Sequence, residues 1–229
     1  MRTPYAHTMT RHALFCAGLA LLGISEVSAE SLDGLFLQMK FAFGRLEESH
    51  YFFTPAGRYM NGVPDGTLDA AGMDRACAQP RGVCGTYQVA GSQLLLAPGK
   101  GRPETHPFER GADGNLKLDG LFAKHVDKFA AGTKLEGKYG RSAGAGAVSA
   151  ASTYIFNADG TFSMTSLGAV STQQGVGKSE TSASGTYRLA GNTLELSSGG
   201  NTKRIVAYPY DLGKGDVRLN LDGVFYKKQ

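Results

Sequence analysis

Few residues in this chain have the types and spacing that catalysis or metal binding requires. Beyond residue 30 the histidines are His50, His106 and His125, and none belongs to a His-x-x-x-His or mixed Cys/His metal motif. We identify no Gly-x-Ser-x-Gly nucleophile elbow and no phosphate-binding P-loop. The sequence therefore predicts no catalytic residue, no metal site, no cofactor and no enzymatic activity.

A calcium loop is the remaining candidate for metal chemistry. Asp65, Asp69 and Asp74 lie close together in the sequence. Their spacing does not follow the alternate-residue pattern of an EF-hand loop. We therefore interpret them as part of a solvated acidic loop.

Two cysteines, Cys77 and Cys84, flank a short segment that contains Pro80 and Gly82. In an exported protein an even number of cysteines usually indicates a disulfide. Closing so short a loop would stabilise the fold by about 2.5 kcal/mol on the chain-entropy account. A redox pair is less consistent with the residues, because the spacing is not Cys-x-x-Cys.

The N-terminus carries the features of a secretory signal. Arg11 and His12 precede an uncharged stretch, residues 13–24, and Val27-Ser28-Ala29 places small residues where a signal peptidase cuts. An apolar run of this length is too short to span a bilayer. We predict a signal peptide over residues 1–29, cleavage after Ala29, and a periplasmic or secreted protein without a membrane span. The formal net charge is only +4 and is spread along the chain, which argues against a nucleic-acid partner.

Beyond the signal segment the chain contains an internal repeat. A Gly-Thr-Tyr segment followed by Gly and a Leu-x-Leu run occurs twice, about a hundred residues apart. The matched pairs of segments are 32–36 with 135–139, 51–59 with 154–162, 85–96 with 185–196, and 116–122 with 219–225. Collinear matches of this kind indicate one structural unit of about 95 residues present in two copies.

Each unit has the pattern of an all-β fold. Short runs alternate apolar and polar residues, as at residues 193–197, and turn residues such as Asp159-Gly160 separate them at intervals of about ten. Closing such a sheet hides its apolar face and removes its edges. We predict two tandem antiparallel up-and-down β-barrels of about eight strands each, at 30–128 and 135–229 with a linker at 129–134. One composite barrel or sandwich built from both halves is the alternative.

Four segments leave the local structure less determined. Residues 32–48 alternate in the manner of a strand, although a helix is the rival because the segment has few breakers. Residues 142–152 are nearly all Ala, Gly and Ser and are predicted to be a flexible loop, and residues 168–184 an extended loop or wide hairpin. Residues 65–75 are expected to form at most a turn or two of helix.

The repeated residues resemble those of the calycin-like group, the lipocalin-like and avidin-like barrels. Gly34-x-Phe36 and Gly137-x-Tyr139 are similar to the Gly-x-Trp of lipocalins, and the Gly-Thr-Tyr hairpin is similar to that of secreted bacterial lipocalin-like domains. The chain departs from lipocalins in having no tryptophan. The resemblance implies small meander barrels that bind a ligand inside or a partner through their loops.

Aromatic residues on the strands of the second repeat give the one positive indication of function. Inside a barrel with a cavity they would line an apolar pocket, and otherwise they would simply fill the barrel. The candidate ligand-binding residues are Tyr139, Tyr154, Phe156, Tyr187, Arg188 and Tyr208. The first hypothesis is an exported, non-enzymatic protein that binds a small apolar or amphipathic ligand in a barrel. The alternative is a cell-envelope protein–protein interaction or inhibitor module that binds through its loops.

Overall fold

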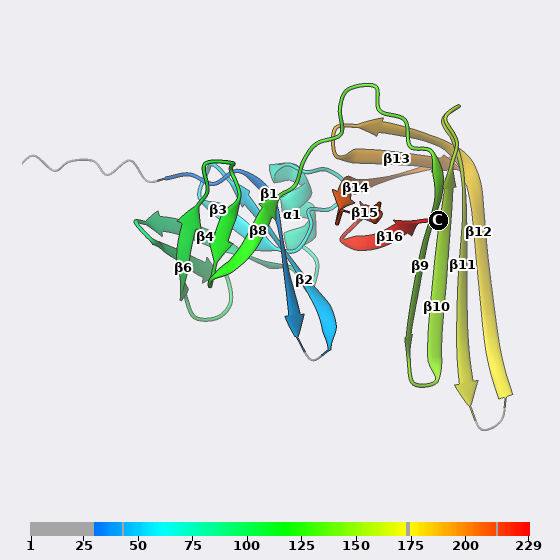
Figure 1. The fold of residues 1–229 in the computed structure, drawn as a ribbon, viewed down its shortest axis with the longest axis horizontal. Coiled ribbons are helices and arrows are strands. Elements are labelled where there is room, and N and C mark those ends of the chain that lie inside the picture. Colours follow the sequence, from blue (N-terminus) through cyan, green and yellow to red (C-terminus); the bar gives the residue numbers. More distant parts are fainter. Residues whose placement is uncertain (1–29, 43, 173–174, 214) are drawn as a thin grey trace, which may run out of the picture.

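The computed structural model describes residues 30–42, 44–172, 175–213 and 215–229. The predicted signal peptide, residues 1–29, lies outside the described residues. The remainder forms two closed antiparallel barrels of eight strands each, in chain order (Figure 1). The prediction of two tandem barrels is confirmed, and the composite alternative is wrong.

In the first barrel every strand pairs with the next along the chain, and β1 closes the sheet by pairing with β8. Residues 34–42 are strand, so the helical alternative for this segment is wrong. The strands are β1 Gly34–Ala42, β2 Arg45–Thr54, β3 Arg58–Asn61, β4 Val83–Ala90, β5 Gln93–Pro98, β6 Glu104–Arg110, β7 Leu116–Leu118 and β8 Leu121–His125.

The second barrel repeats this topology and closes by pairing β16 with β9. Its strands are β9 Gly137–Ala145, β10 Val148–Phe156, β11 Thr161–Thr172, β12 Gly175–Ala190, β13 Thr193–Ser198, β14 Asn201–Asp211, β15 Val217–Leu221 and β16 Val224–Lys228. The prediction of a flexible loop at residues 142–152 is wrong, because β9 and β10 pair from one end to the other and turn at Gly146, whose φ is 58°. Small side chains have weak strand preference alone, and the pairing with neighbouring strands overrides it.

The repeat extends to the geometry of the core. Phe53 and Tyr87 of the first barrel pack edge to face with ring centroids 5.0 Å apart at 80°, and Phe156 and Tyr187 of the second do so at 5.2 Å and 80°. Phe36 lies 5.9 Å from Phe53, and its counterpart Tyr139 lies 6.1 Å from Phe156. The two units therefore bury one aromatic arrangement twice.

The recurring Gly-Thr-Tyr segment has a structural explanation in both copies. A Cβ atom on Gly85 would lie 2.1 Å from the carbonyl oxygen of Ala97, and one on Gly185 would lie 1.8 Å from that of Ser197. Only glycine allows the neighbouring strands to approach so closely. The tyrosine of this segment in the second copy is Tyr187. Its hydroxyl donates a hydrogen bond to the carbonyl oxygen of Leu135, just before the first strand of that barrel.

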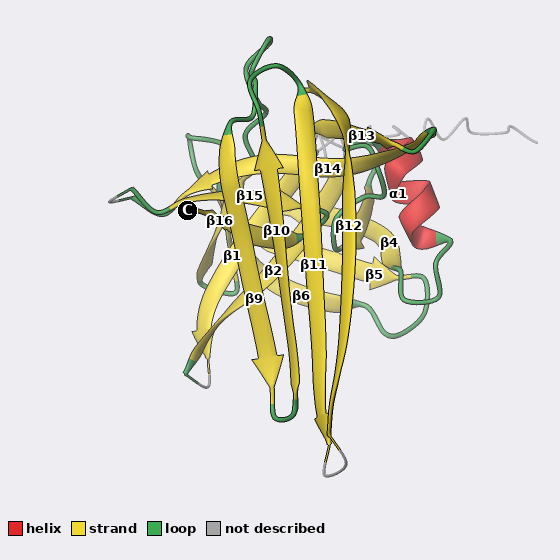
Figure 2. Cartoon of the chain, turned by 90° about the vertical axis from the view of Figure 1, so that its right-hand side faces the viewer, coloured by secondary structure: helices red, strands yellow, loops and turns green. Residues whose placement is uncertain are grey.

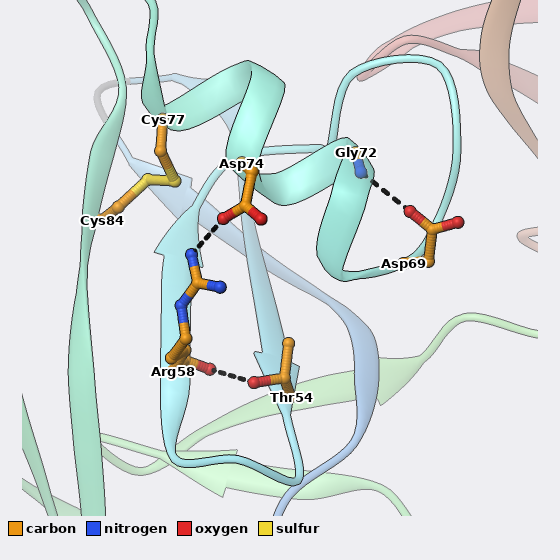
Figure 3. Close-up of polar contacts among 7 residues, drawn as sticks. All are labelled: Thr54, Arg58, Asp69, Gly72, Asp74, Cys77 and Cys84. Carbon is orange, nitrogen blue, oxygen red and sulfur yellow. Dashed lines mark hydrogen bonds and ion pairs between the residues drawn. A yellow bond between two sulfur atoms is a disulfide. The ribbon is translucent and has the colours of Figure 1, made fainter.

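A helix and a disulfide distinguish the first barrel. Helix α1, Ala70–Cys77, lies between β3 and β4, and Asp69 caps its first turn by accepting a hydrogen bond of 2.8 Å from the Gly72 amide (Figure 3). This hydrogen bond lowers the pKa of the Asp69 carboxyl. Cys77 and Cys84 form the predicted disulfide, which ties the end of α1 to β4. Among the described residues no helix is long and apolar enough to cross a membrane.

The barrels meet through a third apolar cluster, separate from the two barrel interiors. Met73 of α1 is buried in it beside residues from the outer faces of both barrels. The buried members are Leu35, Leu37, Phe52, Met60, Met73, Val126, Val206 and Tyr208. The interface core thus makes the two units one packed body.

Candidate functional site

Four of the six candidate ligand-binding residues come together inside the second barrel. Phe156 is at the centre, stacked on Tyr154 at 5.7 Å and in edge contact with Tyr139 and Tyr187. Tyr187 donates to the carbonyl oxygens of Leu135 at 2.6 Å and Asn157 at 3.1 Å. Because the hydroxyl holds backbone carbonyls and the rings contact one another, this cluster occupies the barrel interior as a core.

Burial also shapes the acidity of this cluster. Removal from water raises the pKa of the Tyr154 hydroxyl to about 12 and raises the pKa of Tyr187 as well. Both phenols therefore stay neutral at ordinary pH and act as neutral hydrogen-bonding groups.

The other two candidate residues lie elsewhere. Arg188 is exposed on the outside of the second barrel, opposite Glu195 on the neighbouring strand. Tyr208 is fully buried, but it lies in the interface between the barrels. The structure thus does not bring these two side chains to the interior aromatic cluster.

Tyr208 forms a polar contact across the interface with His50 of β2. The hydroxyl oxygen lies 2.5 Å from His50 Nε2, and the ring of Phe225 stacks on the imidazole at 6.5 Å. Burial lowers the pKa of His50 to about 4 and raises the pKa of Tyr208. The pair is therefore neutral and joins the two barrels.

One segment of the sequence indicates this interface, because it departs from the alternation of apolar and polar residues seen in other strands. Residues 205–208 are four consecutive buried residues on β14. A continuous apolar run of this kind indicates a strand covered on both faces. One face of β14 fills the second barrel, and the other packs against the first.

The second barrel carries a feature that the first lacks: its first four strands run well beyond the point of closure. We call this part the projection, comprising residues 141–153, 164–172 and 175–183. Figures 1 and 2 show its strands side by side, extending away from both barrels. Its side chains are mostly small, yet Val148, Leu167 and Val170 are about half exposed, at 53%, 47% and 47%.

A groove crosses the outer face of the projection. Ser142, Ala151, Leu167 and Glu180 form one cross-strand row of its lining. Leu167 lies three positions from Met164, which packs against the barrel core, so the two side chains occupy opposite faces. The groove has a volume of about 510 Å³, and its lining is mainly apolar, with Lys178 and Glu180 at one side.

The statement that the sequence has no Gly-x-Ser-x-Gly motif is wrong. Gly140-Arg141-Ser142-Ala143-Gly144 has this spacing. A nucleophile elbow requires a sharp strand-to-helix turn that exposes the serine. Here the segment is part of the extended strand β9, with Ser142 paired to Ala151 of β10, so it is not an elbow. Within the described ranges no group of three His, Cys, Asp or Glu side chains gathers as metal ligands.

Comparisons with known proteins give no relative: no family model, no curated protein and no solved structure matches this chain.

Proposed function

We propose that the protein is an exported, non-enzymatic interaction module of the cell envelope whose binding surface is the projection of the second barrel. In this proposal the barrels are calycin-like scaffolds, and residues 1–29 are the signal that directs export. The partner is another protein, which lays an extended segment across the four strands.

The observation that carries the proposal is the groove of about 510 Å³ on the outer face of the projection. It combines an apolar floor of alanine, glycine and Leu167 with charged groups, Lys178 and Glu180, on one strand. Recognition sites for extended peptides have this composition, since apolar contact supplies affinity and a few polar groups fix the register.

The packing of the barrel interiors supports a surface site over an interior one. The same aromatic arrangement fills both barrels, and the tyrosine hydroxyls at its ends hold backbone carbonyls. A small apolar ligand inside a barrel, the first hypothesis from the sequence, stays a prediction.

Site-specific photocrosslinking in the native host tests the proposal. A benzophenone side chain replaces Leu167 in the groove, and the matched control replaces Phe122, which is 59% exposed on β8 of the other barrel. We expect a discrete protein adduct from position 167 and none of the same mass from position 122. Adducts that are identical at both positions, or absent at 167, would contradict the proposal.

A variant with a shortened projection provides a second test of the proposal. Met164 and Ala183 are register partners, so an Asn-Gly turn that replaces residues 165–182 can join them directly. We expect the barrel fold to remain, as judged by near-UV circular dichroism, and the partner to be lost. Retention of the partner by the folded, shortened chain would show that the binding surface is elsewhere.

A further inference from the structure

The outer edge of β12 presents backbone hydrogen-bonding groups with no neighbouring strand in the described chain. β11 pairs with the inner edge of β12 from Gly175 to Thr186, whereas β13 begins to pair with the outer edge only at Thr186. Residues 175–183 therefore form an open edge of about 30 Å at the usual rise per residue.

Two hydrogen bonds identify which residues face outward along this edge. The Tyr187 amide donates to the Gly160 carbonyl on the β11 side, and the Ser184 carbonyl accepts from Ser198 Oγ on the opposite side. Backbone direction alternates along a strand. Lys178 and Glu180 therefore direct their amide and carbonyl groups outward, and Ser179 directs its own toward β11.

Of the features that usually block pairing with another chain, this edge has only charge within the described residues. It contains no proline, and its register with β11 runs without a bulge. Natural edges are normally blunted by such features, by covering elements or by charge. The charged side chains here are Lys178 and Glu180, of opposite sign and two positions apart.

We propose that this edge binds a second copy of the same chain, as an antiparallel β12–β12 pair centred on Ser179. In this two-fold arrangement Lys178 lies opposite Glu180 of the second copy, and Glu180 lies opposite Lys178 of the second copy. Both are hydrogen-bonded pairs, because both residues direct their backbone groups outward. The four-stranded projections of the two copies then form one continuous sheet.

The charges select this register over its neighbours. A shift of two residues in one direction places Lys178 opposite Lys178 of the second copy, and a shift in the other places Glu180 opposite Glu180. Like charges directly opposite each other are destabilising, whereas opposite charges stabilise a cross-strand pair. The open edge of β9 offers no equivalent match, since it is shorter, residues 141–145, and Arg141 is its one charged residue.

The inference rests on the proposed function, which assigns binding to the projection, and names one partner for it. Lys178 and Glu180 also line the groove, so pairing through β12 would bring the grooves of two copies next to each other. A dimer of this kind would present one extended surface to the envelope partner.

Charge reversal tests the pairing on the mature chain, residues 30–229. Sedimentation velocity up to about 100 μM is expected to show a concentration-dependent dimer. Lys178→Glu or Glu180→Lys alone places like charges opposite each other twice and should weaken dimerisation by about tenfold. The double variant Lys178→Glu/Glu180→Lys restores both opposite-charge pairs and should restore the dimer.

Cysteine crosslinking tests the centre of the register. Ser179 lies opposite itself at a non-hydrogen-bonded position, where Cα atoms are about 4.5 Å apart, within the range of a disulfide. Ser179→Cys should therefore give a covalent dimer under mild oxidation. Ser149→Cys, an exposed position on β10 away from the edge, is the matched control.

A monomer throughout the concentration range overturns the proposal, as does failure of the double variant to recover dimerisation. Equal crosslinking at positions 179 and 149, or capture of a different protein by the β12 edge, also overturns it. These failures leave the photocrosslink at position 167 unaffected. Loss of that adduct with an intact dimer would instead reject the envelope partner.

Discussion

The two barrels differ at corresponding positions, residues 62–82 of the first unit and the aligned positions of the second unit, which follow 164 and precede 183. In the first barrel residues 62–82 fold into α1 and end in the Cys77–Cys84 disulfide. In the second barrel the counterpart residues 165–172 and 175–182 continue β11 and β12 as a long antiparallel pair. The first segment packs inward against the other barrel, and the second extends outward.

This difference places one of the two equivalent segments in the interface between the barrels and leaves the other exposed. Met73 of the first segment is almost completely buried in the interface core, and Val63 and Gly66 of the same segment lie within reach of Gly223 and Arg204 of the second barrel. Leu167 of the second segment is half exposed. The first copy therefore uses this position to join the two units, whereas the equivalent position of the second copy is exposed, as the proposed binding surface requires.

The largest expected effect on stability comes from the glycine that both copies have at the same position. Gly85→Ala and Gly185→Ala each place a methyl group within about 2 Å of a backbone carbonyl oxygen on the next strand. We expect each to lower the free energy of unfolding by more than about 4 kcal/mol, because backbone on both sides must move. Urea denaturation of residues 30–229 measures the loss. Gly177→Ala is the control, since its new methyl carbon would lie 3.9 Å from the nearest atom, the carbonyl oxygen of Val170.

An unequal response of the two glycine variants would sharpen the comparison. If Gly185→Ala were tolerated and Gly85→Ala were not, the second barrel would be the more adaptable unit. A small effect in both would contradict the close strand approach in either barrel.

The shared part of the fold was accessible from the sequence because it depends on local patterns. Leu194 and Leu196 alternate with polar neighbours, and the turn at Asp222-Gly223, with φ of 51° and 82°, needs residues that tolerate positive φ. The Cys77–Cys84 disulfide followed from the count and spacing of cysteines. Two matched copies reinforced each of these signals.

The projection was only partly accessible. A wide hairpin was one of the two predictions for residues 168–184, and β11 and β12 do pair, whereas the strands at residues 142–152 are specified by pairing rather than by composition. Residues 142–152 contain a single β-branched residue, Val148, and no aromatic residue. Pairing with the neighbouring strands therefore holds them extended. The role of Tyr208 was hidden for a related reason. Period-two alternation shows on which face of a strand a side chain lies, but it does not show which part of the protein covers that face.

A smaller effect is expected when one side chain in each of the two contrasting segments is replaced by alanine. Met73→Ala removes a buried side chain from the interface core and should cost about 3 kcal/mol of unfolding free energy. Leu167→Ala removes a half-exposed side chain and should change stability by less than about 0.5 kcal/mol. The partner adduct should respond in the opposite order, with Met73→Ala retaining it and Leu167→Ala weakening it. A large stability loss from Leu167→Ala would mean that the projection supports the fold.

Acid titration of the interface is expected to change stability somewhat less than Met73→Ala does. Because burial holds the pKa of His50 near 4 in the folded chain, the unfolded chain, with a pKa near 6.5, takes up the proton first as the pH falls. Stability from this group is complete above pH 6.5, declines as the pH falls toward 4, and should be lower by about 2.5 kcal/mol at pH 4.5 than at pH 7.5.

Replacing the histidine isolates its part of the pH dependence. Glu48, whose pKa is raised mainly by burial, acts with the opposite sign, since its folded form retains a proton more readily as the pH falls. Urea unfolding of His50→Gln should therefore lose less stability than the wild type between pH 7.5 and 4.5, whatever its stability at neutral pH. The position equivalent to His50 in the second copy is Thr153, which does not titrate, so the imidazole at the joint between the barrels comes from the first copy. An unchanged pH slope in His50→Gln would show that the imidazole is not sealed between the barrels.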